Sequence, residues 1–102
     1  MNQEERQELV KYRITKARET FNEVDLHIEN KLWNTAVNRL YYACYYAVIA
    51  LLVEKDIHAQ KHSGVRQTGD YDDYMDFKKE DVLDLIGPAN ELISKIEMLL
   101  SK

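Results

Sequence analysis

The chain has 102 residues, 45% of them apolar and 31% charged, a composition typical of one globular domain with a single modest core. Its net charge of −4 excludes a broad attraction to nucleic acid or to an anionic membrane, so any polyanion site has to be local. Three glycines and one proline are too few for the frequent turns of a sandwich or barrel and favour long helices.

The first predicted helix runs from about Asn2 to Asn30. Its apolar residues recur at alternating spacings of four and three, the period of one helix face, and the remaining positions are mostly charged. That face comprises Val10, Ile14, Ala17, Phe21, Val24 and Ile28. Lys31 and Leu32 leave only a short connection, so this helix and the next are expected to form an antiparallel hairpin.

The longest apolar stretch, Trp33 to Val53, is predicted to be the central helix, and Asn34 or Thr35 is expected to cap it. Its main apolar stripe comprises Trp33, Val37, Leu40, Cys44, Ala47, Val48 and Leu51. A second stripe of small residues, Ala36, Ala43 and Ala50, lets a neighbouring helix approach closely. The uninterrupted apolar run from Leu40 is about 14 residues, shorter than the ~20 of a membrane span, so no membrane partner is expected.

The only charge in this helix is Arg39, and Tyr42 and Tyr46 lie within about 60° of it around the helix axis. Two interpretations remain open. In one, Arg39 pairs with a carboxylate of another helix and the tyrosines only pack, because an unpaired buried charge is costly. In the other, the guanidinium grips a phosphate while the tyrosines donate hydrogen bonds or stack on a base.

The chain turns polar from Ile57 to Asp70 and then acidic up to Asp76, which we interpret as a loop or a short helix followed by a turn. A strongly amphipathic helix is predicted from about Lys79. Gly87-Pro88 interrupts it, so we expect either a bend one turn before the proline or two abutting segments. Its apolar stripe comprises Val82, Leu85, Ile86, Ala89, Leu92, Ile93, Ile96 and Leu99.

Four stretches, AVNRLYYACYYA, KHSGV, GDYDDY and the EDV…LI…IEMLL pattern of the last helix, together resemble the HEPN domain family. The resemblance covers nearly the whole chain, in particular small stand-alone bacterial and archaeal members. It implies a single all-α domain over residues 1–102, an up-and-down bundle of four to five helices that often pairs as a homodimer. Such domains are frequently encoded beside a minimal nucleotidyltransferase, in toxin–antitoxin-like pairs; some are metal-independent RNases, and others bind nucleotides or act as partner modules.

Nuclease-type members of this family carry an arginine followed four to six residues later by a histidine. Here the residues at those places after Arg39 are Cys44, Tyr45 and Tyr46, so the nuclease motif is absent and enzymatic activity stays open. The resemblance adds His62, Asp70 and Tyr71 to the candidate ligand site, and His62 with Arg39 is the candidate catalytic pair. Ser63 is more simply a helix cap.

The chain is also shorter than its family pattern. Relatives place a further helix between the KHSGV and GDYDDY stretches, whereas Val65 and Arg66 abut here. The chain is either shortened or lacks residues near 63–69 that belong to the protein, and we favour the second interpretation.

The leading hypothesis is a cytoplasmic HEPN-like binding or partner module, homodimeric, that engages a nucleotide, RNA or a nucleotidyltransferase partner. One alternative is a metal-independent RNase toxin that uses Arg39 and His62; another is a purely structural oligomerising bundle. No cofactor and no metal site are expected, because no zinc spacing, calcium loop or phosphate loop is present. The single cysteine, Cys44, is predicted to be a core residue in a protein of a reducing compartment.

Overall fold

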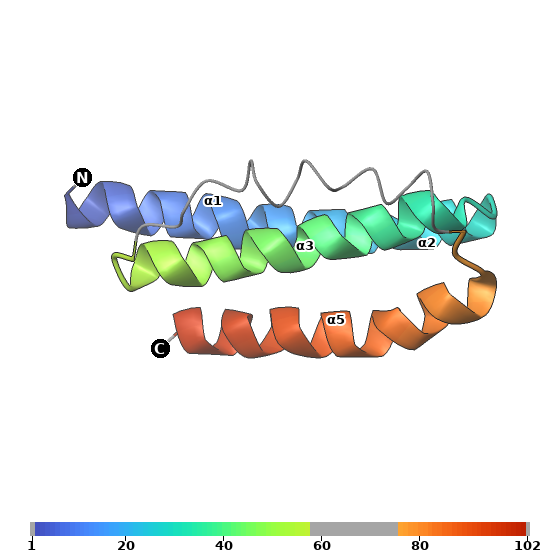
Figure 1. Ribbon diagram of the computed structural model, residues 1–102. Helices are drawn as coiled ribbons and strands as arrows, with labels where there is room; N and C mark the ends of the chain where they lie inside the picture. The colour runs from blue at the N-terminus through green and yellow to red at the C-terminus, as the bar shows by residue number, and fades with distance from the viewer. Residues whose placement is uncertain (1, 58–75, 102) are drawn as a thin grey trace.

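The computed structural model describes residues 2–57 and 76–101, which form helices aligned along one axis (Figure 1). They are α1 (Gln3–Asn22), α2 (Val24–Glu29), α3 (Trp33–Glu54) and α5 (Lys79–Leu100), and the described residues contain no strand. α1 runs antiparallel to α3, as predicted, whereas α3 and α5 run in the same direction (Figure 1). The predicted all-α class is therefore confirmed.

The described residues contain three long helices, with α2 a six-residue continuation of the first, so they do not show the predicted bundle of four to five separate helices. The single predicted helix from Asn2 to Asn30 is divided at Glu23, so α2 follows α1 after one residue. Asn2 begins α1 with a reciprocal capping box: its side chain accepts the Glu5 N–H at 2.7 Å, and its own N–H donates to the Glu5 carboxylate at 3.0 Å.

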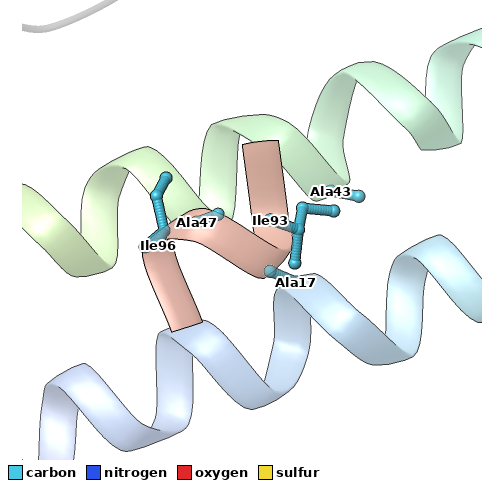
Figure 2. Packing of buried hydrophobic residues seen from close by; sticks show 5 residues of the cluster. All are labelled: Ala17, Ala43, Ala47, Ile93 and Ile96. Atoms are coloured by element: carbon cyan, nitrogen blue, oxygen red, sulfur yellow. The ribbon is translucent and has the colours of Figure 1, made fainter. Parts of the chain in front are cut away.

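Helix α3 lies between α1 and α5, and its alanines form the centre of the core. The side chains of Ala36, Ala43, Ala47 and Ala50 are fully buried. Figure 2 shows Ala43 and Ala47 of α3 facing Ala17 of α1 and Ile93 and Ile96 of α5. Because these residues are small, both neighbouring helices approach the α3 backbone closely.

A second cluster continues the core toward the other end of the bundle. It joins Val24 of α2 and Ala36 and Leu40 of α3 to Val82 and Ala89 of α5. The predicted apolar face of the first helix is confirmed. Val10 is buried, and the other five residues of the face belong to these two clusters or pack against them.

Two predicted apolar stripes are only half correct. On α3 the alanine stripe is the buried one, whereas Val48 of the predicted main stripe is exposed and Cys44 is half-buried. On α5 the core residues are Val82, Ala89, Ile93 and Ile96, whereas Leu85, Leu92 and Leu99 are exposed. Each predicted stripe was wider than the surface that the neighbouring helices cover.

The predicted cap of α3 is wrong. The helix begins at Trp33 without a side-chain cap, and the Asn34 side chain instead accepts the Phe77 N–H at 2.9 Å, which ties the segment before α5 to the start of α3. α3 ends at Glu54, and Asp56 follows in a left-handed conformation (φ 59°). The Ile57 N–H donates to the Leu52 carbonyl at 2.8 Å, as in a Schellman motif.

One guanidinium joins α1 to α5. Arg18 donates from Nε and Nη2 to the Glu97 carboxylate at 3.1 and 2.7 Å, from Nη1 to Asn90 Oδ1 at 2.8 Å, and from Nη2 to Ser94 Oγ at 3.2 Å. The hydrogen bonds to Glu97 raise the pKa of Arg18, and the guanidinium also lies 5.3 Å from the centre of the Phe21 ring. Because each of the three guanidinium nitrogens donates to an acceptor on α5, we name this arrangement the Arg18 clasp.

Helix α5 is continuous through Pro88, and its N-terminal part bends away from the axis of the rest (Figure 1). The predicted bend is therefore the correct one of the two alternatives, and two abutting segments are excluded. Apart from its own chain neighbours and helix backbone, a Cβ atom added at Gly87 would meet nothing within 4 Å among the described residues. Gly87 directly precedes Pro88, and the ring Cδ of a proline crowds the Cβ of a helical residue before it, so a glycine here avoids that clash.

Judged by length and composition alone, one described helix, α3, is long and apolar enough to cross a membrane, and the core helices of soluble proteins often share these properties. Here the buried side of α3 is accounted for by its packing against α1, α2 and α5.

The Arg18 clasp predicts a measurable loss of stability on truncation. Arg18→Ala should lower the free energy of unfolding by about 1–2 kcal/mol, because a bidentate, partly exposed ion pair and the packing over Phe21 are both lost. Arg18→Lys should recover less than half of this, since an ammonium cannot bind Glu97 and Asn90 at once. Urea denaturation followed by circular dichroism measures both, and an Arg18→Ala protein as stable as the wild type contradicts the clasp.

The buried alanine next to the proline predicts a loss of stability. Ala89→Gly should lower the free energy of unfolding by about 1 kcal/mol or more, because glycine is unfavourable inside a helix and a buried methyl group is lost. Thermal unfolding of the two proteins measures the difference. An Ala89→Gly protein with an unchanged melting temperature contradicts the prediction.

Candidate functional site

Arg39 lies half-buried on the flank of α3, beside the alanine stripe. Its Nη2 donates to Asn38 Oδ1 at 3.1 Å, and its guanidinium carbon lies 5.4 Å from the centre of the Tyr42 ring, a cation–π distance. Within residues 2–57 and 76–101, no carboxylate lies within 4.0 Å of Arg39. The internal ion pair of the structural interpretation is therefore absent from the described part of the protein.

Four tyrosine rings continue from this cation around α3, and we name them the tyrosine cluster: Tyr41, Tyr42, Tyr45 and Tyr46. Ring centres are 5.2 Å apart for Tyr41 and Tyr42, 6.1 Å for Tyr42 and Tyr46, and 5.9 Å for Tyr45 and Tyr46. Tyr41 and Tyr45 are nearly parallel, with 11° between their planes, and 6.4 Å apart.

The cluster is anchored at one end, because Tyr46 packs against the core formed by Ala17, Ala43 and Ala47. At its other end Tyr41 is 40% exposed. The helix spacing explains the arrangement: residues three, four and seven positions apart share one side of a helix, so Arg39, Tyr42 and Tyr46 come together as predicted.

This flank has the chemistry of a site for an anion with an aromatic part. A guanidinium is always charged and offers paired donors that match phosphate geometry. Phenol rings stack on bases irrespective of sequence, and their hydroxyl groups donate hydrogen bonds. Nothing on the flank resembles an activated nucleophile; burial raises the pKa of the Cys44 thiol, which keeps it protonated at neutral pH.

The other predicted site residues, His62, Asp70 and Tyr71, lie outside the described residues, as do Ser63 and the proposed discontinuity between Val65 and Arg66. Their grouping with Arg39 stays a prediction. No group of three or more potential metal-ligating side chains occurs in the described part of the chain.

Two polar features escaped the sequence analysis. The first is a hollow of about 580 Å³ between α1 and α5, bounded by the Arg18 clasp and floored by Val10, Ile14 and Leu100. The sequence signal for this hollow was a polar series at helical spacing along α5: Asn90, Ser94 and Glu97. The second is Arg13, whose Nε is buried without a hydrogen-bond partner in the described structure, and whose guanidinium lies 5.7 Å from the Tyr12 ring centre.

The chain is similar in sequence to several known proteins. A UPF0332 protein of Thermotoga maritima is 32% identical over 124 aligned positions, which cover 94% of this chain and 94% of that protein. Two proteins of Methanocaldococcus jannaschii, both candidate toxins by name, are 28% identical over 85% of this chain and 41% identical over 48% of it. They are covered over 78% and 37% of their own lengths. No solved structure gives a significant match.

The Thermotoga alignment also bears on length. Because 94% of 102 residues is about 96, about 28 of its 124 positions have no residue in this chain. The relative thus carries additional residues of the amount that one further helix and its connections require. The position between Val65 and Arg66 stays a prediction.

The family follows from a direct match. The profile described as HEPN domain matches residues 10–68, more than half of the chain and the part that contains α3 with Arg39 and the tyrosine cluster. The full-length similarity to the Thermotoga protein agrees with it. The chain therefore belongs to the HEPN domain family.

Proposed function

We infer that this protein is a HEPN module that binds a nucleotide or RNA through the flank of α3 formed by Arg39, Tyr42 and Tyr46. The observation that carries the proposal is the state of Arg39: half-buried, seated on a tyrosine ring and without a carboxylate partner among the described residues. A cation so placed retains its attraction for a phosphate. The tyrosine cluster beside it supplies a surface for the base.

The negative net charge is compatible with such a site. A protein of charge −4 repels polyanions at long range, so binding depends on short-range contacts and on a single strong cation. This favours a mononucleotide or a short single strand over a long duplex, because few phosphates are neutralised.

Toxin-related activity is the second candidate function, and the names of the two Methanocaldococcus relatives favour it. The chemistry would be metal-independent RNA cleavage, with Arg39 stabilising negative charge at the phosphorus and His62 transferring a proton. The absence of the family's histidine after Arg39 argues against it. A nucleotidyltransferase partner and a cytoplasmic location belong to the proposal on the resemblance alone.

Arg39→Gln tests the proposal. It should weaken binding of a fluorescein-labelled single-stranded RNA and of ATP at least 10-fold, because a charge-assisted bidentate contact is lost. For RNA, the slope of log K against log salt should become shallower by about 1. Fluorescence polarisation measures the RNA and calorimetry the nucleotide. Tyr42→Phe should weaken binding little, since the ring remains.

Arg6→Gln is the matched control. Arg6 is also partly exposed on a helix, but it pairs with Asp56 at 3.5 Å and lies away from the tyrosine cluster, so its loss should leave binding unchanged. Equal affinities for the wild type and Arg39→Gln would refute the site. RNA cleavage in excess chelator that Arg39→Gln and His62→Ala both abolish would instead establish the RNase candidate.

A further inference from the structure

Two of the four arginines in the described part of the chain have no carboxylate partner there. Arg6 and Arg18 each form an ion pair, at 3.5 and 2.7 Å. Arg13 and Arg39 have no carboxylate within 4.0 Å among residues 2–57 and 76–101. The guanidinium of each lies beside a tyrosine ring instead, 5.7 Å from the ring centre for Arg13 and 5.4 Å for Arg39. Both cations therefore keep their attraction for an anion.

Arg13 carries a polar group that nothing in the described residues satisfies. The residue is half-buried, and its Nε is buried without a hydrogen-bond partner among them. Buried polar groups of native proteins almost always have a partner, because leaving one unsatisfied costs its full desolvation. The neighbouring Tyr12 offers only its ring face, and that residue is 60% exposed. A bound anion would supply the missing acceptor to this guanidinium.

Arg13 and Arg39 lie on the same side of the bundle. Around the α1 axis, Arg13 lies about 40° from Ala17, which packs on α3, and about 140° from Arg18, which binds α5. Around the α3 axis, Arg39 borders the buried alanine stripe and lies about 140° from Cys44, which lines the groove between α3 and α5. Both arginines are therefore at the junction of α1 and α3, on the side away from α5.

The antiparallel register of α1 and α3 sets the distance between these two cations (Figure 1). Ala17 of α1 lies level with Ala43 and Ala47 of α3, because the three pack in one cluster (Figure 2). Arg13 is one turn earlier on α1. Since the helices run in opposite directions, it lies one turn later on α3, level with about Ile49.

Arg39 is ten residues from this level, about 15 Å along the α3 axis. Tyr42 and Tyr46 lie between the two arginines, with ring centres 6.1 Å apart. Sites for single-stranded nucleic acid combine these parts, with cations on the phosphates and aromatic rings under the bases. The adjacent phosphates of a nucleoside triphosphate cannot reach both arginines. A strand stacked as in a duplex advances about 3.4 Å per nucleotide, so about five nucleotides span the interval.

We propose that Arg13 is a second phosphate-binding residue of the candidate site, and that the ligand is a single-stranded oligonucleotide long enough to contact Arg13 and Arg39 at once. The inference rests on the proposed function, because Arg39 has to bind the first phosphate. It also narrows that function. A mononucleotide engages one arginine, whereas a strand of about five nucleotides engages both, and the second contact adds to the affinity of the first. Arg13 therefore selects the ligand by its length.

Arg13→Met tests the proposal, because methionine removes the charge and the buried Nε and keeps an unbranched side chain. It should weaken binding of a fluorescein-labelled hexauridylate by about 10-fold or more and leave the affinity for ATP unchanged. For the hexamer, the slope of log K against log salt should become shallower by about 0.7. Fluorescence polarisation measures the hexamer and calorimetry the ATP. Lys11→Met is the matched control: Lys11 lines the hollow between α1 and α5, so its loss should change neither affinity.

Thermal unfolding separates a ligand-binding role of Arg13 from a structural one. Arg13→Met should leave the melting temperature unchanged or raise it, since an unpartnered buried donor is removed. A lowered melting temperature with equal losses for ATP and the hexamer would identify a structural role and overturn the proposal. If Arg39→Gln weakens hexamer binding and Arg13→Met does not, the second cation is refuted and the proposed function stands. If Arg39→Gln has no effect on either ligand, the proposed function itself fails.

Discussion

The close approach of helices to the alanine stripe of α3 is the constraint on which the rest of the structure depends. Four alanines with no exposed surface let α1 and α5 approach one side of the central helix. Large side chains on that side would hold the neighbours apart and cost about 1–3 kcal/mol each by overpacking. The bulky residues of α3 are therefore displaced to its two flanks. One flank carries Arg39 with Tyr42 and Tyr46, and the other carries exposed or half-buried apolar residues such as Cys44 and Val48.

Much of the helical framework was predictable, because it depends on periodicity within one segment. α3 and α5 begin where the sequence predicted, and the apolar face from Val10 to Ile28 is the one that packs. Periodicity alone does not predict which residues are buried where an apolar stripe is wider than the surface that the neighbouring helices cover. Nothing in the spacing of the last helix distinguishes Ile93, fully buried, from Leu92, 38% exposed, because that difference is set by where α3 and α1 lie. The predicted cap of α3 is wrong for a similar reason. The side-chain oxygen of Asn34 accepts the N–H of Phe77, 43 positions away, and local sequence does not show that partner.

The residues of the candidate site also fall into those whose grouping local spacing predicts and those whose grouping it does not predict. Arg39, Tyr42 and Tyr46 are three and seven residues apart, so their grouping follows from the helix alone, and the structure confirms it. The Arg18 clasp joins residues up to 79 positions apart, and no local pattern predicts such a pairing. The resemblance drew attention to His62, Asp70 and Tyr71, residues that periodicity could not have linked to α3. Arg13, whose Nε has no hydrogen-bond partner among the described residues, gave no sequence signal at all.

The shared direction of α3 and α5 has a consequence for how the chain accommodates changes in length. Two parallel helices require a return path as long as the bundle, and α3, with 22 residues, is about 33 Å long. Residues 55–78 are 24 residues, which reach about 80 Å when extended, so closure is possible without further chain. Doubling such a connection adds only about 0.6 kcal/mol of closure entropy. Placed in this connection, about 28 further residues of the kind that the Thermotoga relative carries would therefore cost little closure entropy.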